Sequence, residues 1–327
     1  MRAVATAPAK IILTGEHFVV MGKPAIAMAV NLYSKVNITR RDDPKICIKS
    51  NLLNAVGSFQ SGRYVPEMGG EDAGNALLPV HLVASNLMKR AGLNDHGLSI
   101  EIDSSIPMGA GLGSSASVAV SVIAALSKLL EMRISREEIR ELAFIPERYV
   151  HGRPSGIDQT TATLGGVIAF SLDRGFEPVK SKSDIPIVIG NTGEKRSTGE
   201  QIVKVQSISL ERPGEFDDVA ARAGEISAQA RKAIENGELK LLGKLMNDNH
   251  ELLRWLGLSN KKLEELISAA RSAGALGAKL TGAGGGGCMI ALVEPGMENM
   301  IAKAVARSGG ESFAVKTDRK GVKGWLE

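Results

Sequence analysis

Residues 107–117 read Pro-Met-Gly-Ala-Gly-Leu-Gly-Ser-Ser-Ala-Ser and have the composition of a phosphate-binding loop. Glycines stand at alternate positions, Gly109, Gly111 and Gly113, and two serines follow them. Glycines allow neighbouring backbone N–H groups to point toward one ligand, and a following helix adds the positive end of its dipole. The segment therefore predicts a cradle for phosphate groups.

Two better-known phosphate motifs do not match this loop. No Lys-Ser or Lys-Thr pair follows a G-x-x-x-x-G spacing, as the Walker A loop requires. The third glycine comes one residue too early for the G-x-G-x-x-G dinucleotide fingerprint. A helix is expected next, because Val118, Val122 and Leu126 recur at helical spacing. The alternative interpretation is a glycine-rich turn that only begins a core helix.

A second glycine cluster, Thr-Gly-Ala-Gly-Gly-Gly-Gly-Cys over residues 281–288, contains a literal G-x-G-x-x-G. A dinucleotide site needs a helix next, but the pattern that follows is that of a strand. So many glycines instead indicate a backbone that approaches another group very closely. The alternative is a hairpin without a special role. We interpret Cys288 as a small packed residue and not as a nucleophile, since no basic residue adjoins it in the sequence.

Two acidic residues between these clusters could serve phosphoryl transfer. Asp158 follows a Pro-Ser-Gly turn at residues 154–156, and a carboxylate held there could orient or deprotonate an attacking hydroxyl group. Glu147 offers a hard oxygen ligand of the kind that Mg²⁺ prefers. The alternatives are that Asp158 only caps the turn and that Glu147 is solvated.

Near the N-terminus, Lys10 lies on a predicted strand, and Gly15, Glu16 and His17 lie on the loop after it. A single lysine, glutamate or histidine is usually structural or solvated. Here several ionisable residues lie close together in a segment that should pack beside the first glycine loop, which favours a functional site.

The elements that must position these residues follow from hydrophobic periodicity. Strands are expected over residues 9–13, 25–30, 35–40, 98–102, 185–190, 278–281, 288–293 and 311–316. Helices are expected over residues 75–91, 116–130, 217–235, 238–256 and 261–273, and from Pro295. Ser135 and Glu138 form a capping box that opens one more helix, which Pro146 should end or bend. Residues 50–75 have no clear period and predict a long loop.

Length and composition indicate a globular protein of two domains. The chain has 327 residues, 43% of them hydrophobic and 23% charged. We place the domains at residues 1–182 and 183–327, the second with a β-α-β-β-α-β order and additional helices.

The same data argue against several classes of function. A net charge of +4 and 4% aromatic residues are too little for a nucleic-acid partner. Neither a signal peptide nor a membrane span is apparent, and two cysteines in different contexts fit a reducing compartment. We expect a cytoplasmic protein without nucleic-acid or membrane partners.

Residues 8–22, 107–116 and 279–288 together resemble the three motifs of the GHMP kinases, and the resemblance spans nearly the whole chain. The first motif is similar to the branch that acts on mevalonate. Galactokinases continue Gly-Glu-His with Thr-Asp, where this chain has Phe18-Val19, and phosphomevalonate kinases typically carry Tyr in place of His17. The resemblance implies an α+β fold, with an N-terminal domain like the second domain of ribosomal protein S5, a ferredoxin-like C-terminal domain, and the site between them.

The resemblance also implies a reaction and a role for each site residue. The reaction is direct transfer of a phosphoryl group from ATP to the 5-hydroxyl group of mevalonate, in isoprenoid biosynthesis. Asp158 would accept or orient the hydroxyl proton beside Lys10, and Ser115 and Glu147 would hold Mg²⁺. Mevalonate would contact Glu16, His17 and Ser197 or Thr198. The residues implied to bind ATP are Pro107, Gly109, Ala110, Gly111, Leu112, Gly113, Ser114 and Ser115.

Two other functions remain open on the sequence alone. A phosphomevalonate kinase would need further cations, and Arg153 and Arg196 are candidates; Arg153 stands where the family often has Asn. A catalytically silent metabolite sensor could share the fold, although retention of Lys10, Ser115 and the two acidic residues argues against it. We expect a homodimer, but no sequence signal determines the oligomeric state.

Overall fold

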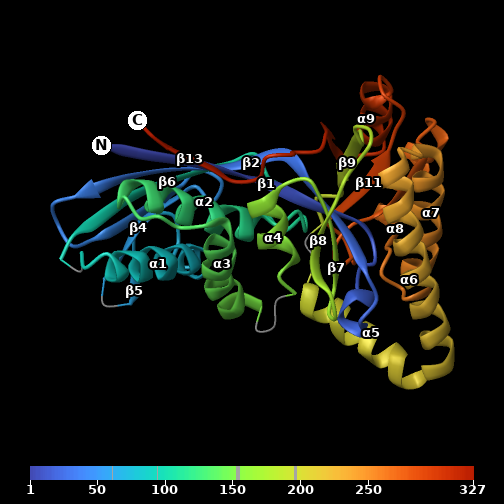
Figure 1. Ribbon diagram of the computed structural model, residues 1–327, viewed down its shortest axis with the longest axis horizontal. Coiled ribbons are helices and arrows are strands. Elements are labelled where there is room, and N and C mark those ends of the chain that lie inside the picture. The colour runs from blue at the N-terminus through green and yellow to red at the C-terminus, as the bar shows by residue number, and fades with distance from the viewer. Residues whose placement is uncertain (61, 94, 152–154, 195–196) are drawn as a thin grey trace.

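The computed structural model describes residues 1–60, 62–93, 95–151, 155–194 and 197–327, and for residues 148–151 it describes the backbone only. The chain folds into two halves, each a sheet covered by helices (Figure 1). The mixture of helices and largely antiparallel sheets confirms the α+β class.

The larger sheet contains nine strands among the described residues, in the order β13-β1-β2-β6-β3-β4-β5, with β7 paired to β2 and β8 paired to β7. Its two longest strands, β1 and β2, pair antiparallel, and α2 (Ser114–Leu129) packs against both of them. The first of these strands is buried along almost its whole length, which explains its nearly continuous run of apolar residues. The strands are β1 (Arg2–Thr14), β2 (Ala25–Arg41), β3 (Ile46–Ser50), β4 (Ala55–Gln60), β5 (Arg63–Met68), β6 (Gly97–Ser104), β7 (Val167–Ser171), β8 (Gly175–Val179) and β13 (Lys323–Leu326).

Four helices belong to this half: α1 (Ala73–Arg90), α2 (Ser114–Leu129), α3 (Arg136–His151) and α4 (Ile157–Leu164). The predicted helices near residues 75–91 and 116–130 are confirmed. The predicted capping box is confirmed as well. The Glu138 backbone N–H donates to Ser135 Oγ at 3.2 Å, and the Ser135 N–H donates to the Glu138 carboxylate at 2.9 Å.

One sequence-based prediction was wrong in this half. Residues 50–75 are not one long loop, because they contain the β4–β5 hairpin. The hairpin is stabilised by packing that local periodicity does not show, since Phe59 contacts Tyr64 across the strands and stacks on His81 of α1. The expectation that Pro146 ends or bends α3 is a separate case. The helix does not end there but continues to His151, and a bend at the proline stays a prediction. Packing of α3 against its neighbours α1, α2 and α4 outweighs the backbone hydrogen bond that the proline removes.

The second half has a four-stranded sheet in the order β10-β11-β9-β12. Its strands are β9 (Ile187–Asn191), β10 (Gly277–Leu280), β11 (Cys288–Leu292) and β12 (Glu311–Val315). Its helices are α6 (Pro213–Asn236), α7 (Leu239–Trp255), α8 (Lys261–Ser272) and α9 (Glu298–Arg307). The predicted β-α-β-β-α-β order is confirmed, and α5 (Thr198–Glu211) is a helix that the sequence analysis did not predict.

The C-terminal segment crosses back from the second half to the first, where β13 pairs with β1. On the way, Asp318 holds a turn: its Oδ1 accepts from the N–H groups of Lys320 at 2.9 Å and Gly321 at 2.6 Å. Its Oδ2 accepts from the Tyr33 hydroxyl at 2.7 Å. Burial and this hydrogen bond raise the pKa of Tyr33. The predicted domain boundary at residue 182 stays a prediction. Strand β13 follows that boundary in the sequence but pairs with β1 of the first half.

Asp318→Ala should lower the free energy of unfolding by about 2–4 kcal/mol, because it leaves buried donors without their charged acceptor. Asp184→Ala is the matched control, since it removes an exposed ion pair with Arg319 and should cost less than about 1 kcal/mol. Urea denaturation of both variants would measure the difference. Equal values for the two would show that the turn does not depend on Asp318.

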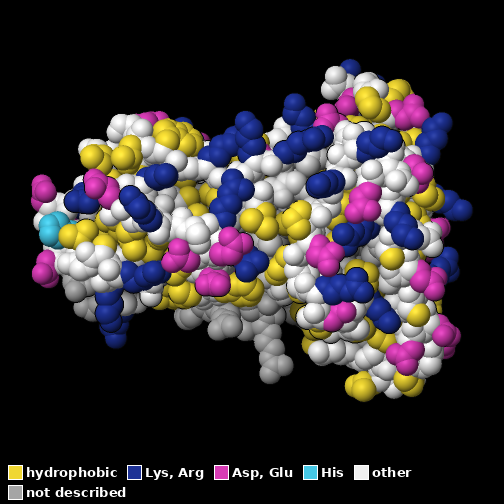
Figure 2. All heavy atoms as spheres, in the orientation of Figure 1, with side chains coloured by type: hydrophobic (Ala, Val, Ile, Leu, Met, Phe, Trp, Pro, Cys, Tyr) yellow, Lys and Arg dark blue, Asp and Glu magenta, His cyan; other side chains and the backbone are white. Residues whose placement is uncertain are grey.

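On the face shown in Figure 2, lysine and arginine side chains lie interspersed with acidic and apolar ones. In the part of the chain that the structure describes, no helix is both long and apolar enough to cross a membrane.

Candidate active site

The first glycine loop connects β6 to α2. Gly109, Gly111 and Gly113 all have positive φ angles, of 66°, 82° and 73°, which side chains other than glycine rarely tolerate. Gly113 is the residue that precedes α2, and Ser114 and Ser115 begin its first turn. The loop thus leads directly into a helix N-terminus, the arrangement that favours an anion.

Lys10 of β1 lies against this loop. Its backbone N–H donates to Leu112 O at 2.9 Å, and its Nζ donates to Gly111 O at 3.1 Å. The same Nζ lies 3.2 Å from Asp158 Oδ1. The lysine side chain is 6% exposed and that of Asp158 is 35% exposed, so a ligand can reach the carboxylate while the ammonium group stays fixed.

Asp158 lies in the first turn of α4, after Gly156, whose φ is 86°. A side chain at Gly156 would come within 2.6 Å of the Phe144 ring, so the turn before Asp158 is tightly enclosed. A helix N-terminus stabilises a carboxylate in its first turn. A Cβ atom at Gly113 would lie 3.2 Å from Lys10 Cγ and 3.5 Å from Asp158 Oδ2. Three segments that are far apart in the sequence therefore meet at one point.

The two predicted magnesium ligands lie on neighbouring helices. Ser115 is exposed in the first turn of α2, and Glu147 is buried on α3, which packs against α2. A hydroxyl group and a carboxylate are hard oxygen donors that suit Mg²⁺, which usually takes one or two protein oxygens together with phosphates. Among the described residues, no group of three His, Cys, Asp or Glu side chains forms a metal site.

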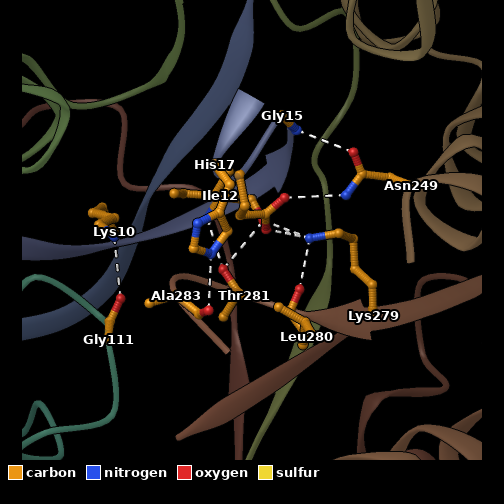
Figure 3. A network of polar contacts seen from close by, with 11 residues as sticks. Lys10, Ile12, Gly15, His17, Gly111, Asn249, Lys279, Leu280, Thr281 and Ala283 are labelled. Carbon is orange, nitrogen blue, oxygen red and sulfur yellow. Dashed lines mark hydrogen bonds and ion pairs between the residues drawn. The ribbon is translucent and has the colours of Figure 1, made fainter. Parts of the chain in front are cut away.

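The Gly15-Glu16-His17 segment is joined to the second half of the molecule by a polar network (Figure 3). Glu16 forms an ion pair with Lys279 of β10, and both side chains are essentially buried, at 1% and 0% exposure. Asn249 of α7 donates to the other Glu16 oxygen at 3.1 Å and accepts from the Gly15 N–H at 3.1 Å. Both carboxylate oxygens thus bind groups of the protein itself. The contact between Glu16 and substrate stays a prediction.

Burial lowers the pKa values of two basic groups in and beside this network, Lys279 and His250. Burial lowers the pKa of Lys279, and Glu16 opposes that effect. His250, next to Asn249, has a pKa lowered to about 3, first by burial and then by the charge of Lys279. Its ring is therefore neutral near pH 7, so His250 adds no positive charge beside Lys279.

His17 follows Glu16 in the sequence and is only partly buried. Its backbone is in the left-handed region, with φ 64° and ψ −39°, a strained conformation for a residue with a side chain. Its Nε2 lies 2.8 Å from Ala283 O in the second glycine loop. Beside it, Thr281 Oγ1 accepts from the Ile12 N–H at 2.9 Å. The two predicted motifs at the ends of the chain are thus in direct contact.

The second glycine loop makes the close approach that the sequence predicts, and the groups it approaches belong to the protein. A Cβ atom at Gly284 would lie 2.5 Å from Leu258 O, and one at Gly285 would lie 2.5 Å from Gln201 Nε2. The Gly285 N–H donates to Leu258 O at 2.7 Å. The strand that follows the loop is confirmed, and Cys288 is fully buried in it, as expected of a packed residue.

Three further predictions concern Ser197 or Thr198, Arg153 and Arg196. Ser197 caps α5, where its Oγ accepts from the Glu200 N–H at 3.3 Å, and Thr198 is exposed in the first turn. Their contact with substrate stays a prediction. Arg153 and Arg196 lie outside the described residues.

The sequence analysis did not predict that Lys279 and Asn249 contact the Gly15-Glu16-His17 segment. A lysine inside the apolar strand 277–280 was a usable signal, because lysine is almost never fully buried without a partner. Asn249 gave no comparable signal, since polar residues recur along that helix.

The comparisons with known proteins identify the family of this chain. Residues 79–166 match the model of the GHMP kinases N terminal domain, and residues 230–310 match that of the GHMP kinases C terminal. The chain is 41% identical to the mevalonate kinase of Thermococcus gammatolerans, over 99% of this chain and 98% of the relative. It is 40% identical to that of Pyrococcus abyssi, over 98% and 97% of the two chains.

Solved structures give the same result. The L. major mevalonate kinase in complex with R-mevalonate superposes with a TM-score of 0.84 at 28% identity, over 96% of this chain and 95% of that one. The Methanococcus jannaschii mevalonate kinase also has a TM-score of 0.84 at 28% identity, over 96% and 98% of the chains. A Lactococcus lactis galactokinase complexed with galactose has a TM-score of 0.77 at 25% identity, over 98% and 95%. The fold implied by the three motifs is confirmed.

Proposed function

The chain belongs to the GHMP kinase family and, within it, to the mevalonate kinases, and we propose that it transfers the γ-phosphoryl group of ATP to the 5-hydroxyl group of mevalonate. The product would be 5-phosphomevalonate, for isoprenoid biosynthesis. The observation that carries the assignment of roles is the Lys10–Asp158 pair beside the glycine loop that opens α2.

Phosphoryl transfer depends more on positioning and charge neutralisation than on covalent help from the protein. The partly exposed carboxylate of Asp158 can accept or orient the proton of the attacking hydroxyl group. The adjacent ammonium group of Lys10 neutralises charge on the hydroxyl oxygen and on the transferring group. The N–H groups at the start of α2 bind the phosphates of ATP. Direct in-line transfer needs no phosphoenzyme.

The oxygen donors of Ser115 and Glu147 are suited to hold Mg²⁺ together with the phosphates of ATP. The ion would neutralise charge on the β- and γ-phosphates. His17, and the predicted Ser197 or Thr198, would contact mevalonate. A cytoplasmic location and a homodimer stay predictions.

Glu147→Gln should raise the Mg²⁺ concentration for half-maximal activity by roughly tenfold or more, because an amide oxygen is a weaker ligand than a carboxylate. Excess Mg²⁺ should partly restore the rate. Glu141→Gln, an exposed position on the same helix, is the control. A magnesium titration that is unchanged in Glu147→Gln would show that this residue is structural.

Substrate identity is tested by coupled ADP release with mevalonate, phosphomevalonate, galactose and homoserine. We expect kcat/KM for mevalonate to exceed that for each other compound by at least about a hundredfold, because the mismatched polar groups would lack partners. Preference for phosphomevalonate would favour the alternative kinase, and lack of turnover with all four would favour a metabolite sensor.

A further inference from the structure

The buried ion pair between Glu16 and Lys279 links the first motif of the chain to β10, the strand before the second glycine loop. Lys279 Nζ also donates to Leu280 O, and both charged side chains are almost completely removed from solvent. Removing two charges from water costs more than their attraction often returns, so a buried pair is weak evidence for stability. Stability alone therefore does not explain why this pair is buried. The residues next to Glu16 in the sequence, Gly15 and His17, suggest a different role for it.

The network fixes the backbone directly before His17. Asn249 binds Gly15 through its side-chain oxygen and Glu16 through its nitrogen, so one amide holds two successive residues. Gly15 has φ 93°, and a Cβ atom there would lie 2.5 Å from Pro24 O, so the other side of the segment is enclosed as well. A strained residue persists only where its surroundings determine its conformation. His17, at φ 64°, is the strained residue in question.

The ion pair and the side-chain hydrogen bonds described for residues 15–17 join this loop to the second half of the molecule. Lys279 lies on β10, Asn249 on α7, and Ala283, which binds the His17 ring, in the second glycine loop. Figure 3 shows these groups converging on the loop after β1, while Lys10, earlier on the same strand, points to the first glycine loop. Strand β1 and the loop after it therefore carry two side chains with proposed roles, Lys10 and His17, and each is held by a different part of the molecule.

We infer that Glu16 and Lys279 are positioning residues for the mevalonate subsite, and that Asn249 supports them. They do not touch the substrate. They hold residues 15–17 so that the His17 ring is fixed in place before the substrate arrives. This inference rests on the proposed function, in which His17 contacts mevalonate. Pre-organisation of this kind lowers the cost of binding, so its loss should weaken substrate binding more than ATP binding.

Single substitutions in the pair would leave one buried charge without its partner and should lower Tm strongly. The informative variant is therefore the double substitution Glu16→Gln/Lys279→Met, which removes both charges and keeps similar side-chain volumes. We expect its Tm to lie within a few degrees of the parent. We expect the KM for mevalonate to rise about tenfold and the KM for ATP to change less than about twofold. The control is Lys262→Met/Glu265→Gln, which removes a partly exposed pair on α8 and should change neither KM.

A double-mutant cycle with His17→Ala separates positioning from mere structural support. If the pair acts through His17, Glu16→Gln/Lys279→Met should raise the KM for mevalonate only slightly in a His17→Ala background. An effect of the same size in both backgrounds would overturn the inference. A folded double variant with an unchanged KM for mevalonate would overturn it too, as would an equal rise in both KM values.

Asn249→Ala provides a second route if the double variant does not fold, because it leaves the ion pair in place. It should raise the KM for mevalonate by roughly threefold to tenfold with little effect on the KM for ATP, and an unchanged KM for mevalonate would contradict the inference.

Failure of the proposed function would give a different result. In that case His17→Ala itself, expected to raise the KM for mevalonate by roughly fivefold to a hundredfold, would leave it unchanged, or mevalonate would not be turned over.

Discussion

Asp158→Asn should lower kcat by at least about a hundredfold, because the amide keeps the shape of the side chain and removes its charge and basicity. The KM for ATP should change little, since the phosphates are expected to bind at the start of α2. Steady-state kinetics with mevalonate and ATP measures both values. The residue lies in the first turn of α4 with its carboxylate 35% exposed, so the substitution should not disturb the core.

Asp217→Asn is a matched control, because that residue is exposed near the start of α6. It should retain the parent kcat. Retention of more than a tenth of the parent turnover in Asp158→Asn would show that Asp158 is not the group that handles the hydroxyl proton.

Lys10→Met should lower kcat by about a hundredfold to a thousandfold, the range observed when one pre-organised electrostatic group is removed from a transition state. The ammonium group contacts both Asp158 and the carbonyl of Gly111, so it lies between the expected base and the expected phosphate cradle. Methionine fills a similar volume, which limits the damage to packing. Lys10→Arg should not restore the rate, because the larger guanidinium group does not fit a side-chain site that is only 6% exposed.

Lys35→Met on β2 is the control, since that side chain is exposed and lies on a neighbouring strand. It should leave kcat unchanged. If Lys10→Met instead raised the KM for ATP without lowering kcat, the lysine would contribute to binding alone, and the proposed role in transition-state stabilisation would be wrong.

Local patterns in the sequence were sufficient for much of the fold. Helical periodicity predicted α1, α2 and α6–α8, and the Ser135–Glu138 capping box formed as expected. The order of strands and helices in the second half was also predicted correctly, except that α5 was missed. These features depend on backbone preference and on the burial of one face of each element. Both can be predicted from residues that lie close together in the sequence.

Features that depend on distant residues could not be predicted in the same way. The β4–β5 hairpin is stabilised by aromatic packing onto α1, and β13 pairs with a strand at the opposite end of the chain. Helix α3 passes through Pro146 because its packing compensates for a lost hydrogen bond. In each case tertiary contacts overrode a local signal.

By itself, the sequence determined the chemistry of this protein: two glycine loops, a lysine and two acidic residues of the types that phosphoryl transfer needs. The tertiary structure decided which of these groups meet. It brought Lys10 to Asp158 and Gly113, and it placed Glu16 in a buried pair with Lys279. The physical reason is that residue type sets what a side chain can do, whereas burial and the distance to a partner set which of those actions is possible.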